Sequence, residues 1–241
     1  MSAWNKIPWF AALAVLAGTA SLLVFGVFAP KAAGRLLPIA LTGNEFVDGK
    51  LKYQIVTLVV SLLVLAVVYA SRPANAQRFY RWGDMKAPAQ AVGWLGIKTG
   101  DNWLGVGLNF AIIVSVATGA FIFFSMARGQ SLEPGNARWL PWVLVLAASN
   151  AFVEEAITRL GVVTALDGAL PRPWIYIISA LVFAIPHFFG VPGGALGSLM
   201  AGFLGWLLAK SIGETGGMGW AWLIHFIQDI IIFGAMFLVA L

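Results

Sequence analysis

The chain has 241 residues, of which 60% are hydrophobic and only 10% are charged, against roughly a quarter charged in soluble domains. This composition excludes an ordinary soluble protein and indicates an integral membrane protein. The absence of cysteine excludes disulfides, thiolate catalysis and thiolate metal sites. The net charge of +5 lies mainly in the loops between apolar runs, which is typical of anchors to lipid headgroups and argues against a nucleic-acid partner.

Seven apolar stretches approach or exceed the roughly 20 residues that a helix needs to cross the hydrocarbon core. In chain order they are Ile7–Ala29, Tyr53–Ser71, Trp103–Ala127, Trp139–Leu166, Trp174–Phe189, Gly193–Ala209 and Met218–Leu241. The first is too long for the core of a cleavable signal peptide, so we interpret it as a retained span. The pattern predicts an all-α fold, a polytopic transmembrane bundle of about seven to eight helices in one membrane domain, 1–241.

The connecting segments are short, apart from residues 72–102. That segment mixes arginines with aromatic residues and prolines, which predicts an amphipathic stretch lying on the membrane surface; a substrate gate is the alternative. Turns are expected at Arg128–Arg138 and Ile212–Gly219. The first loop is expected to hold four basic residues, Lys31, Arg35, Lys50 and Lys52. The loops on the same side of the membrane as the amino terminus, where Lys210 is also placed, are expected to carry slightly more basic residues than the loops on the other side. This excess favours a cytoplasmic amino terminus.

Two of the expected spans carry local signals. Pro186 is expected to kink the fifth span beside His187, because proline removes a backbone hydrogen bond. In the sixth span small residues recur at every fourth position, which lets another helix approach closely. They are Gly193, Gly197, Ala201, Gly205 and Ala209.

Three clusters of ionisable residues lie inside the last expected spans. They are Glu154-Glu155-Ala-Ile-Thr-Arg159, Phe183-Ala-Ile-Pro-His187 and His225-Phe-Ile-Gln-Asp229. A charged side chain at the bilayer centre costs at least about 2.5 to 3.5 kcal/mol on insertion scales, so such clusters point to function. At 1.5 Å of rise per residue, Glu154, His187 and Asp229 would each lie roughly 16 to 23 Å from a helix end. The clusters can therefore converge at one depth.

The spacing within the first cluster separates two roles. Glu155 and Arg159 lie four residues apart on one helix face, where they can neutralise each other; an ion pair that only makes the charges tolerable is the simplest reading. Glu154 points about 100° away and has no counter-charge at that spacing, although Arg159 could reach it across a turn. Glu154 is therefore a candidate general base.

The histidines supply the remaining polar groups. Asp229 lies four residues after His225 and can hold its imidazole in one orientation or favour its charged form; a purely structural clamp between helices is the alternative. His187 comes from another helix, and Phe183 before it is expected to be a packing residue. A carboxylate and a histidine that deprotonate water, faced by donors to the oxyanion, can hydrolyse an amide without a serine or cysteine nucleophile.

The order Glu-Glu-x-x-x-Arg, Phe-x-x-x-His and His-x-x-x-Asn/Asp on successive spans resembles the CAAX-protease and bacteriocin-processing (CPBP) superfamily. It is also called the Abi family of intramembrane glutamic endopeptidases. The resemblance covers about Trp139 to the carboxyl terminus and implies a division into accessory spans with an interfacial segment, 1–138, and catalytic core helices, 139–241.

The resemblance also implies a role for each motif residue. Glu154 and His187 would activate the attacking water, while His225 and Asp229 would form the oxyanion site. Glu155 and Arg159 would support Glu154. The eukaryotic CAAX proteases have Asn at the last position, and an ionised Asp cannot donate the hydrogen bond that an Asn amide donates. Asp229 would then be protonated, or would act by orienting His225.

The implied reaction is endoproteolytic cleavage near the carboxyl terminus of a membrane-associated peptide or protein, with a prenylated CAAX peptide as the family's eukaryotic substrate. We expect no cofactor and no metal, in an integral protein of a prokaryotic inner membrane. A metallopeptidase is the chemical rival, because two histidines with Glu and Asp could hold zinc. A non-proteolytic scaffold or bacteriocin self-immunity protein is the second class. A proton-coupled transporter is a third, against which stands the lack of an internal repeat.

Overall fold

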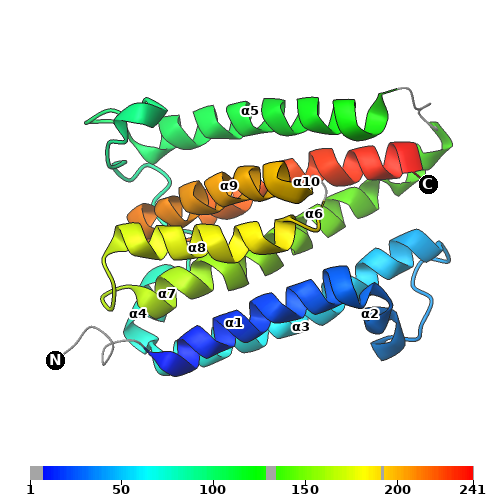
Figure 1. The fold of residues 1–241 in the computed structure, drawn as a ribbon, viewed down its shortest axis with the longest axis horizontal. Helices are drawn as coiled ribbons and strands as arrows, with labels where there is room; N and C mark the ends of the chain where they lie inside the picture. The colour runs from blue at the N-terminus through cyan, green and yellow to red at the C-terminus, as the bar shows by residue number, and fades with distance from the viewer. Residues whose placement is uncertain (1–7, 129–133, 191–192, 241) are drawn as a thin grey trace.

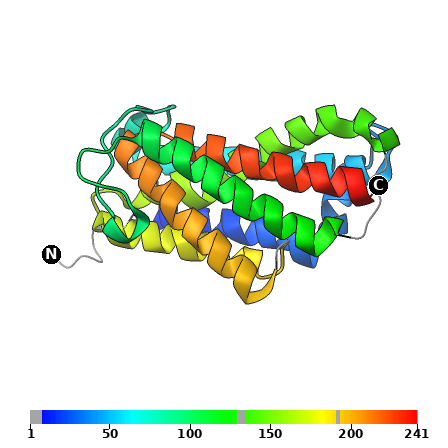
Figure 2. The ribbon, with the colours of Figure 1, turned by 90° about the horizontal axis from the view of Figure 1, so that it is seen from above.

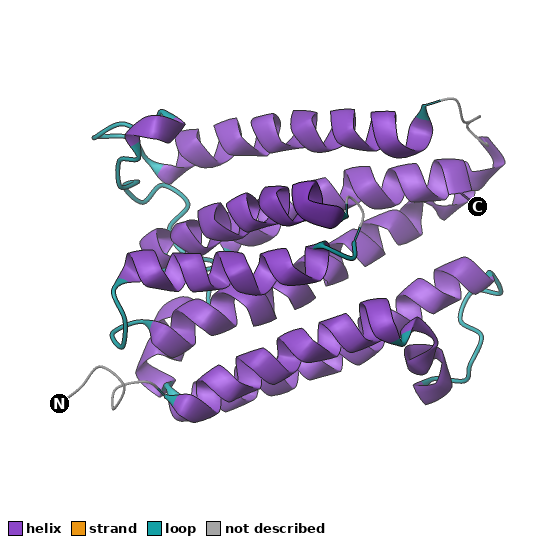
Figure 3. Ribbon diagram, viewed as in Figure 1, coloured by secondary structure: helices purple, strands orange, loops and turns teal. Residues whose placement is uncertain are grey.

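The computed structural model describes residues 8–128, 134–190 and 193–240, and within them the chain forms helices and no strand (Figure 3). Six of these helical stretches are long and apolar enough to cross a membrane. They are Trp9–Phe28, Glu45–Ser71, Trp103–Ser125, Gly135–Leu166, Gly194–Thr215 and Gly219–Leu238. The all-α polytopic bundle is confirmed.

The amino-terminal part is a helical hairpin with a short helix at its turn. Helix α1 is Trp9–Leu23 and continues as a π-helical turn, Val24–Phe28; α2 is Pro30–Leu36 and α3 is Glu45–Ser71. Helix α3 begins well before the expected Tyr53, because the Asn44 side chain accepts hydrogen bonds from the amides of Phe46 and Val47. The prediction that four basic residues lie in a loop is therefore wrong. Lys31 and Arg35 belong to α2, and Lys50 and Lys52 to α3.

The segment between the hairpin and the bundle has little regular structure. It contains α4, Pro73–Phe79, and a 3₁₀ turn, Gly93–Leu95. A buried ion pair on helix α9, Gly194–Thr215, holds it in place. Lys210 donates to the Gln90 carbonyl oxygen (3.0 Å) and pairs with Glu214, which accepts from the Gln90 amide (3.1 Å) and the Trp103 indole (2.9 Å). Lys210 is thus 2% exposed inside a helix and is not the loop anchor that the sequence predicted.

The remaining helices form the bundle that carries the three motifs (Figure 1). Its members are α5, Trp103–Ile122, with a π turn, Phe123–Ala127; a 3₁₀ turn, Pro134–Trp139; α6, Leu140–Glu155; a π turn, Ala156–Gly161; α7, Val162–Leu166; α8, Arg172–His187; α9, Gly194–Thr215; and α10, Gly219–Ala240. Seen from above, α5 crosses over the pair formed by α9 and α10 (Figure 2). The turn that the sequence predicted at Arg128–Arg138 lies partly outside the described residues.

Two of the expected spans differ from the structure. Helix α8 has 16 residues, as many as the expected fifth span, but begins two residues earlier, and it is not among the helices long enough to cross a membrane. Pro186 is its next-to-last residue and does not kink the middle of the helix. Helix α9 continues beyond Ala209 to Thr215, and the turn is made by Gly216, whose φ of 72° favours glycine. The expected turn at Ile212–Gly219 therefore begins too early.

The small-residue face of α9 packs against α8, as its spacing predicts. A Cβ atom at Gly205 would lie 3.2 Å from the Ala180 Cα atom and 3.3 Å from the Phe183 Cβ atom, so any larger residue would push the two helices apart. The contact matters for function because Phe183 and His187 both lie on α8.

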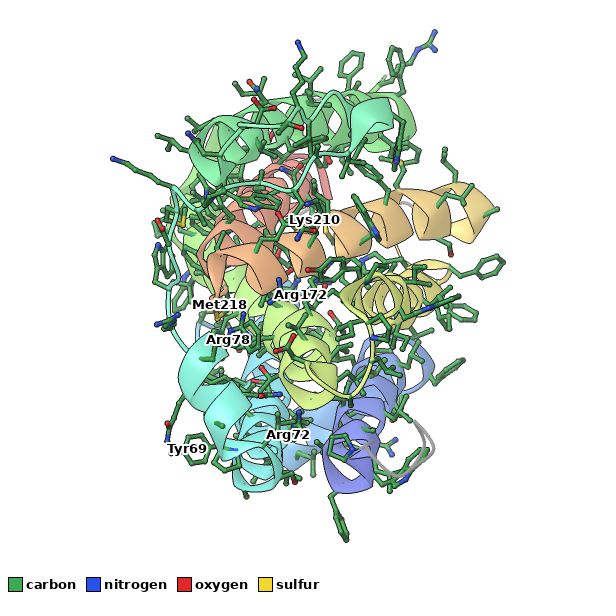
Figure 4. All side chains as sticks on the ribbon, turned by 90° about the vertical axis from the view of Figure 1, so that its left-hand side faces the viewer. Tyr69, Arg72, Arg78, Arg172, Lys210 and Met218 are labelled. Carbon is green, nitrogen blue, oxygen red and sulfur yellow. The ribbon has the colours of Figure 1, made fainter. Side chains whose placement is uncertain are left out.

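A group of arginines marks one end of the molecule, the left-hand end of Figure 1, which faces the viewer in Figure 4. Arg78 and Arg172 lie 3.1 and 3.6 Å from the Asp167 carboxylate, and Arg72 donates to the Asp167 carbonyl oxygen. These residues come from α4 and from the ends of α3, α7 and α8, and they tie these elements together.

Candidate active site

The structure brings all six predicted site residues together inside the bundle. They come from α6, the π turn that follows it, α8 and α10. His225 lies at the centre of the group. Its Nε2 atom is 3.5 Å from Glu154 Oε2 and 3.6 Å from Asp229 Oδ2, and its Nδ1 atom is 2.7 Å from Glu155 Oε1.

Glu155 has two partners. Its Oε1 atom accepts a hydrogen bond from Arg159 at 2.6 Å, and both side chains have no exposed surface. The same oxygen lies 2.7 Å from His225 Nδ1 and fixes the ring. The sequence assigned the orientation of His225 to Asp229, but Asp229 lies beyond hydrogen-bond distance of the imidazole, at 3.6 Å. Glu155 therefore performs this task, beyond the ion pair predicted for it.

Phe183 does more than fill space. Its ring lies under the guanidinium of Arg159, with 3.5 Å between the Arg159 Cζ atom and the ring centroid. The same ring is 4.1 Å from the ring centroid of His187 and 5.8 Å from that of His225. Phe183 thus lies against the buried cation and both histidines and links the second motif to the first.

Glu154 keeps one carboxylate oxygen free. Its Oε1 atom accepts a hydrogen bond from the Asn150 amide at 3.2 Å, whereas its Oε2 atom is buried and has no hydrogen-bond partner among the described residues. A buried polar atom without a partner is rare in folded proteins and asks for an explanation. Here the free oxygen faces His225 and can accept a proton from a bound water molecule.

His187 also has one ring nitrogen, Nε2, without a hydrogen-bond partner among the described residues. Its Nδ1 atom lies 2.8 Å from the Phe183 carbonyl oxygen, and because a carbonyl oxygen only accepts, Nδ1 carries the proton. In the neutral ring Nε2 then has a lone pair and can act as a base. This hydrogen bond, four residues along the same helix, fixes the tautomer.

Two amide side chains that the sequence analysis did not single out belong to the same network. Asn150 lies one turn before Glu154 and donates from Nδ2 to Glu154 Oε1 (3.2 Å) and to Asp229 Oδ2 (3.1 Å). Gln54 on α3 donates to Asn150 Oδ1 at 2.8 Å and so fixes which way the Asn150 amide points. Polar residues inside an apolar span are the signal that could have found both.

The π turn after Glu155 alters the backbone at the site. Such turns insert extra backbone into an α-helix and often occur at functional sites. The Thr158 hydroxyl donates to the Glu154 carbonyl oxygen at 2.6 Å, and the Ser179 hydroxyl on α8 donates to the Thr158 carbonyl oxygen at 2.7 Å. The hydroxyls thus satisfy carbonyl groups around the turn and connect α8 to it.

Two cavities meet at Glu154 and His187. The larger, about 570 Å³, lies between the amino-terminal hairpin and helices α6 and α8. The smaller, about 350 Å³, lies among α5, α9 and α10 and is lined mainly by apolar side chains. Both are lined by Glu154, His187, Asn150 and Phe183, so these residues form the wall that the cavities share. A substrate could therefore extend into both cavities from one reacting bond.

No group of three His, Asp or Glu side chains within the described residues is arranged to hold a metal ion.

Comparison with known proteins supports the family suggested by the three motifs. Residues 136–231 match the family model of the type II CAAX prenyl endopeptidase Rce1-like proteins. None of the curated proteins and none of the solved structures compared with the chain matches it. The family match covers less than half of the chain but contains all three motifs, and it confirms the resemblance to the CAAX proteases. That family is one of membrane peptidases.

Proposed function

We propose that the chain is an intramembrane endopeptidase that cleaves a peptide bond near the carboxyl terminus of a membrane-associated substrate, of which a prenylated CAAX-type peptide is one candidate. The observation that carries this proposal is the free Oε2 atom of Glu154, which is buried beside His225 in the wall shared by two cavities. The family match supports the peptidase class.

In the proposed reaction Glu154 and His187 activate a water molecule. One of the two bases takes a proton from the water as its oxygen attacks the peptide carbonyl carbon, and the carbonyl oxygen becomes an oxyanion. The same proton then passes to the leaving amine nitrogen as the peptide bond breaks. The products are a new carboxyl terminus and a released peptide with a free amine.

His225 is the proposed donor to the oxyanion. In its cationic form it donates through Nδ1 to Glu155 and through Nε2 toward the reacting carbonyl. Asp229 acts indirectly in this scheme, since its carboxylate accepts from Asn150 and cannot donate when ionised. Asp229 and Gln54 would together hold the Asn150 amide against Glu154.

The proposed catalytic residues all lie in the segment 139–241, but Gln54 on α3 binds Asn150, which in turn donates to Glu154. We therefore propose that the hairpin within 1–138 has an accessory role. It completes the site but supplies none of the reacting groups.

The test is cleavage of a panel of quenched fluorescent peptides, prenylated and plain, by protein purified in detergent. Glu154→Gln and His187→Ala should each lower kcat/KM by about 10²- to 10⁴-fold, the usual contribution of a general base. Asp84→Asn is the matched control, because it changes an exposed carboxylate outside both cavities. Activity should survive a chelator.

Each other result favours a different function. Activity unchanged in both variants would remove this mechanism. Loss of activity on chelation, with one tightly bound zinc per chain, would favour the metallopeptidase. A Glu154→Gln protein that retains full activity in cells would favour the non-proteolytic scaffold or self-immunity protein.

A further inference from the structure

Gln228 on α10 has a polar atom that the proposed mechanism does not use. The residue lies three positions after His225 and is only 3% exposed. Its Oε1 atom is buried and has no hydrogen-bond partner among the described residues. Such atoms are rare in folded proteins, because an unpaired buried acceptor has lost its hydration without compensation. A ligand that donates a hydrogen bond would supply the compensation.

The hydrogen bonds of the Gln228 amide fix the position of its oxygen. Its Nε2 atom donates to the Ser115 hydroxyl on α5 at 3.0 Å and to the Ile224 carbonyl oxygen at 3.2 Å. Because a carbonyl oxygen only accepts, the end of the amide that faces Ile224 must be the NH₂ group. Both of its N–H groups are used by these two contacts. Gln228 therefore offers a ligand an acceptor and no donor.

Gln228 lines the smaller cavity and not the larger one. Outside the network around Glu154, the polar residues that line the smaller cavity are Gln228 and Thr118, and the others are apolar or glycine. Apolar side chains of a peptide can be buried in such a cavity, but each backbone N–H that enters loses water and needs an acceptor. The Oε1 atom of Gln228 is an acceptor of this kind, held in place by α5.

The position of Gln228 on α10 limits which N–H group it can reach. His225, the proposed donor to the reacting carbonyl, lies three residues before it, so the two side chains are neighbours on the helix surface. Their separation along the helix axis is about 4.5 Å. An extended peptide covers about 3.3 to 3.6 Å per residue. The N–H group that Gln228 reaches therefore belongs to a residue at most about two positions from the reacting bond.

We propose that Gln228 Oε1 accepts a hydrogen bond from one backbone N–H group of the peptide substrate, in the smaller cavity and close to the bond that is cleaved. The site rests on the proposed peptidase function and adds to it a requirement for an unsubstituted backbone nitrogen at one position of the substrate. Proline has no N–H group, so substrates with proline at this position are rejected.

The test measures binding of an apolar hexapeptide with a fluorescent amino terminus to the Glu154→Gln protein in detergent. Fluorescence anisotropy reports binding, and the variant prevents cleavage. In a series of analogues, one backbone amide at a time is replaced by an ester, which removes the N–H group and keeps the length of the peptide. One analogue should bind about tenfold more weakly than the parent peptide. The analogue with proline at the same position should bind as weakly or more so.

The Gln228→Met substitution in the same background ties this effect to the residue. It should weaken binding of the parent peptide about tenfold and leave the affinity of the sensitive ester unchanged, because that ester already lacks the hydrogen bond. Gln228→Leu should reproduce the result. Thr57→Val is the matched control, because it also removes a buried polar group from a span but lines neither cavity. It should leave every affinity unchanged.

Three results would overturn the subsite: no binding of the parent peptide, equal binding of the parent and all esters, or equal weakening of the parent and the sensitive ester by Gln228→Met. Cleavage by the protein with Glu154 intact is scored separately. A Gln228→Met protein that cuts the parent peptide with the kcat/KM of wild type would refute the subsite and leave the peptidase proposal standing. The mapped cut should lie at most about two residues from the sensitive amide, and a more distant cut would also refute the subsite.

Discussion

Replacing Glu155 by Ala should destabilise the protein strongly, beyond any effect on activity. The Arg159 guanidinium has no exposed surface, and Glu155 is the carboxylate with which it forms an ion pair among the described residues. Its Nε and Nη2 atoms have no hydrogen-bond partner there. The substitution would leave a buried cation beside the Phe183 ring and the Thr158 hydroxyl, and would also remove the acceptor for His225 Nδ1.

Removing one partner of a buried ion pair usually costs about 3 to 5 kcal/mol, because the other charge stays desolvated. For a chain of this size each kcal/mol lowers the melting temperature by about 2 to 4 °C. We therefore expect Glu155→Ala to lower it by about 6 to 20 °C. Glu155→Gln should cost less, since its amide oxygen can still accept from Arg159 and His225.

The measurement is thermal unfolding in detergent, followed by tryptophan fluorescence. The decisive comparison is the double variant Glu155→Ala with Arg159→Met, which removes both charges and keeps an apolar side chain over Phe183. It should be more stable than Glu155→Ala alone. A single variant that melts within about 2 °C of wild type, or a double variant less stable than the single one, would refute this account of the buried pair.

Three further predictions concern the network and its packing. Gln54→Leu should lower kcat/KM by about tenfold, the effect expected from the loss of one hydrogen bond, with little change in melting temperature. Unchanged kinetics would mean that α3 does not help to hold Asn150. Asp229→Asn should retain activity on the peptide panel because an amide oxygen can still accept from Asn150, and a loss comparable to that of Glu154→Gln would instead show that the negative charge is required. Gly205→Val should destabilise the protein by about 1 to 3 kcal/mol by forcing α9 away from α8, and a wild-type melting curve would contradict that close packing.

The sequence predicted the class of fold well because length and apolar composition dominate the energetics of a membrane span. The long helix around Glu154 and the convergence of three motifs at one depth follow from the same reasoning. Boundaries were less predictable. Hydrogen bonds to the Asn44 side chain start α3 before the predicted residue, and the conformation of Gly216 ends α9 after the predicted one. Neither feature depends on hydropathy.

The partners within the site were harder to predict than its members. Spacing alone suggested that Asp229 orients His225, since the two lie four residues apart on one helix. The structure instead supplies Glu155 from another helix, because the relative rotation of α6 and α10 is set by packing over the whole bundle. Asn150 and Gln54 lie outside the three motifs, and their contacts join residues that are distant in the chain. Sequence periodicity contains no information about such contacts.

The π turn at Ala156–Gly161 has a consequence for the length of the chain at this point. Because such a turn holds more residues than an α-helical one, the helix upstream and downstream of it is out of phase with an uninterrupted α-helix. Deleting one residue there would restore uninterrupted α-helical winding and leave α6 and α7 in nearly their present relative orientation, because the turn accommodates one extra residue. The chain could therefore be shortened by one residue at this point without a change of fold, and the extra residue is a local feature of the site, confined to the backbone that carries Thr158 and Arg159.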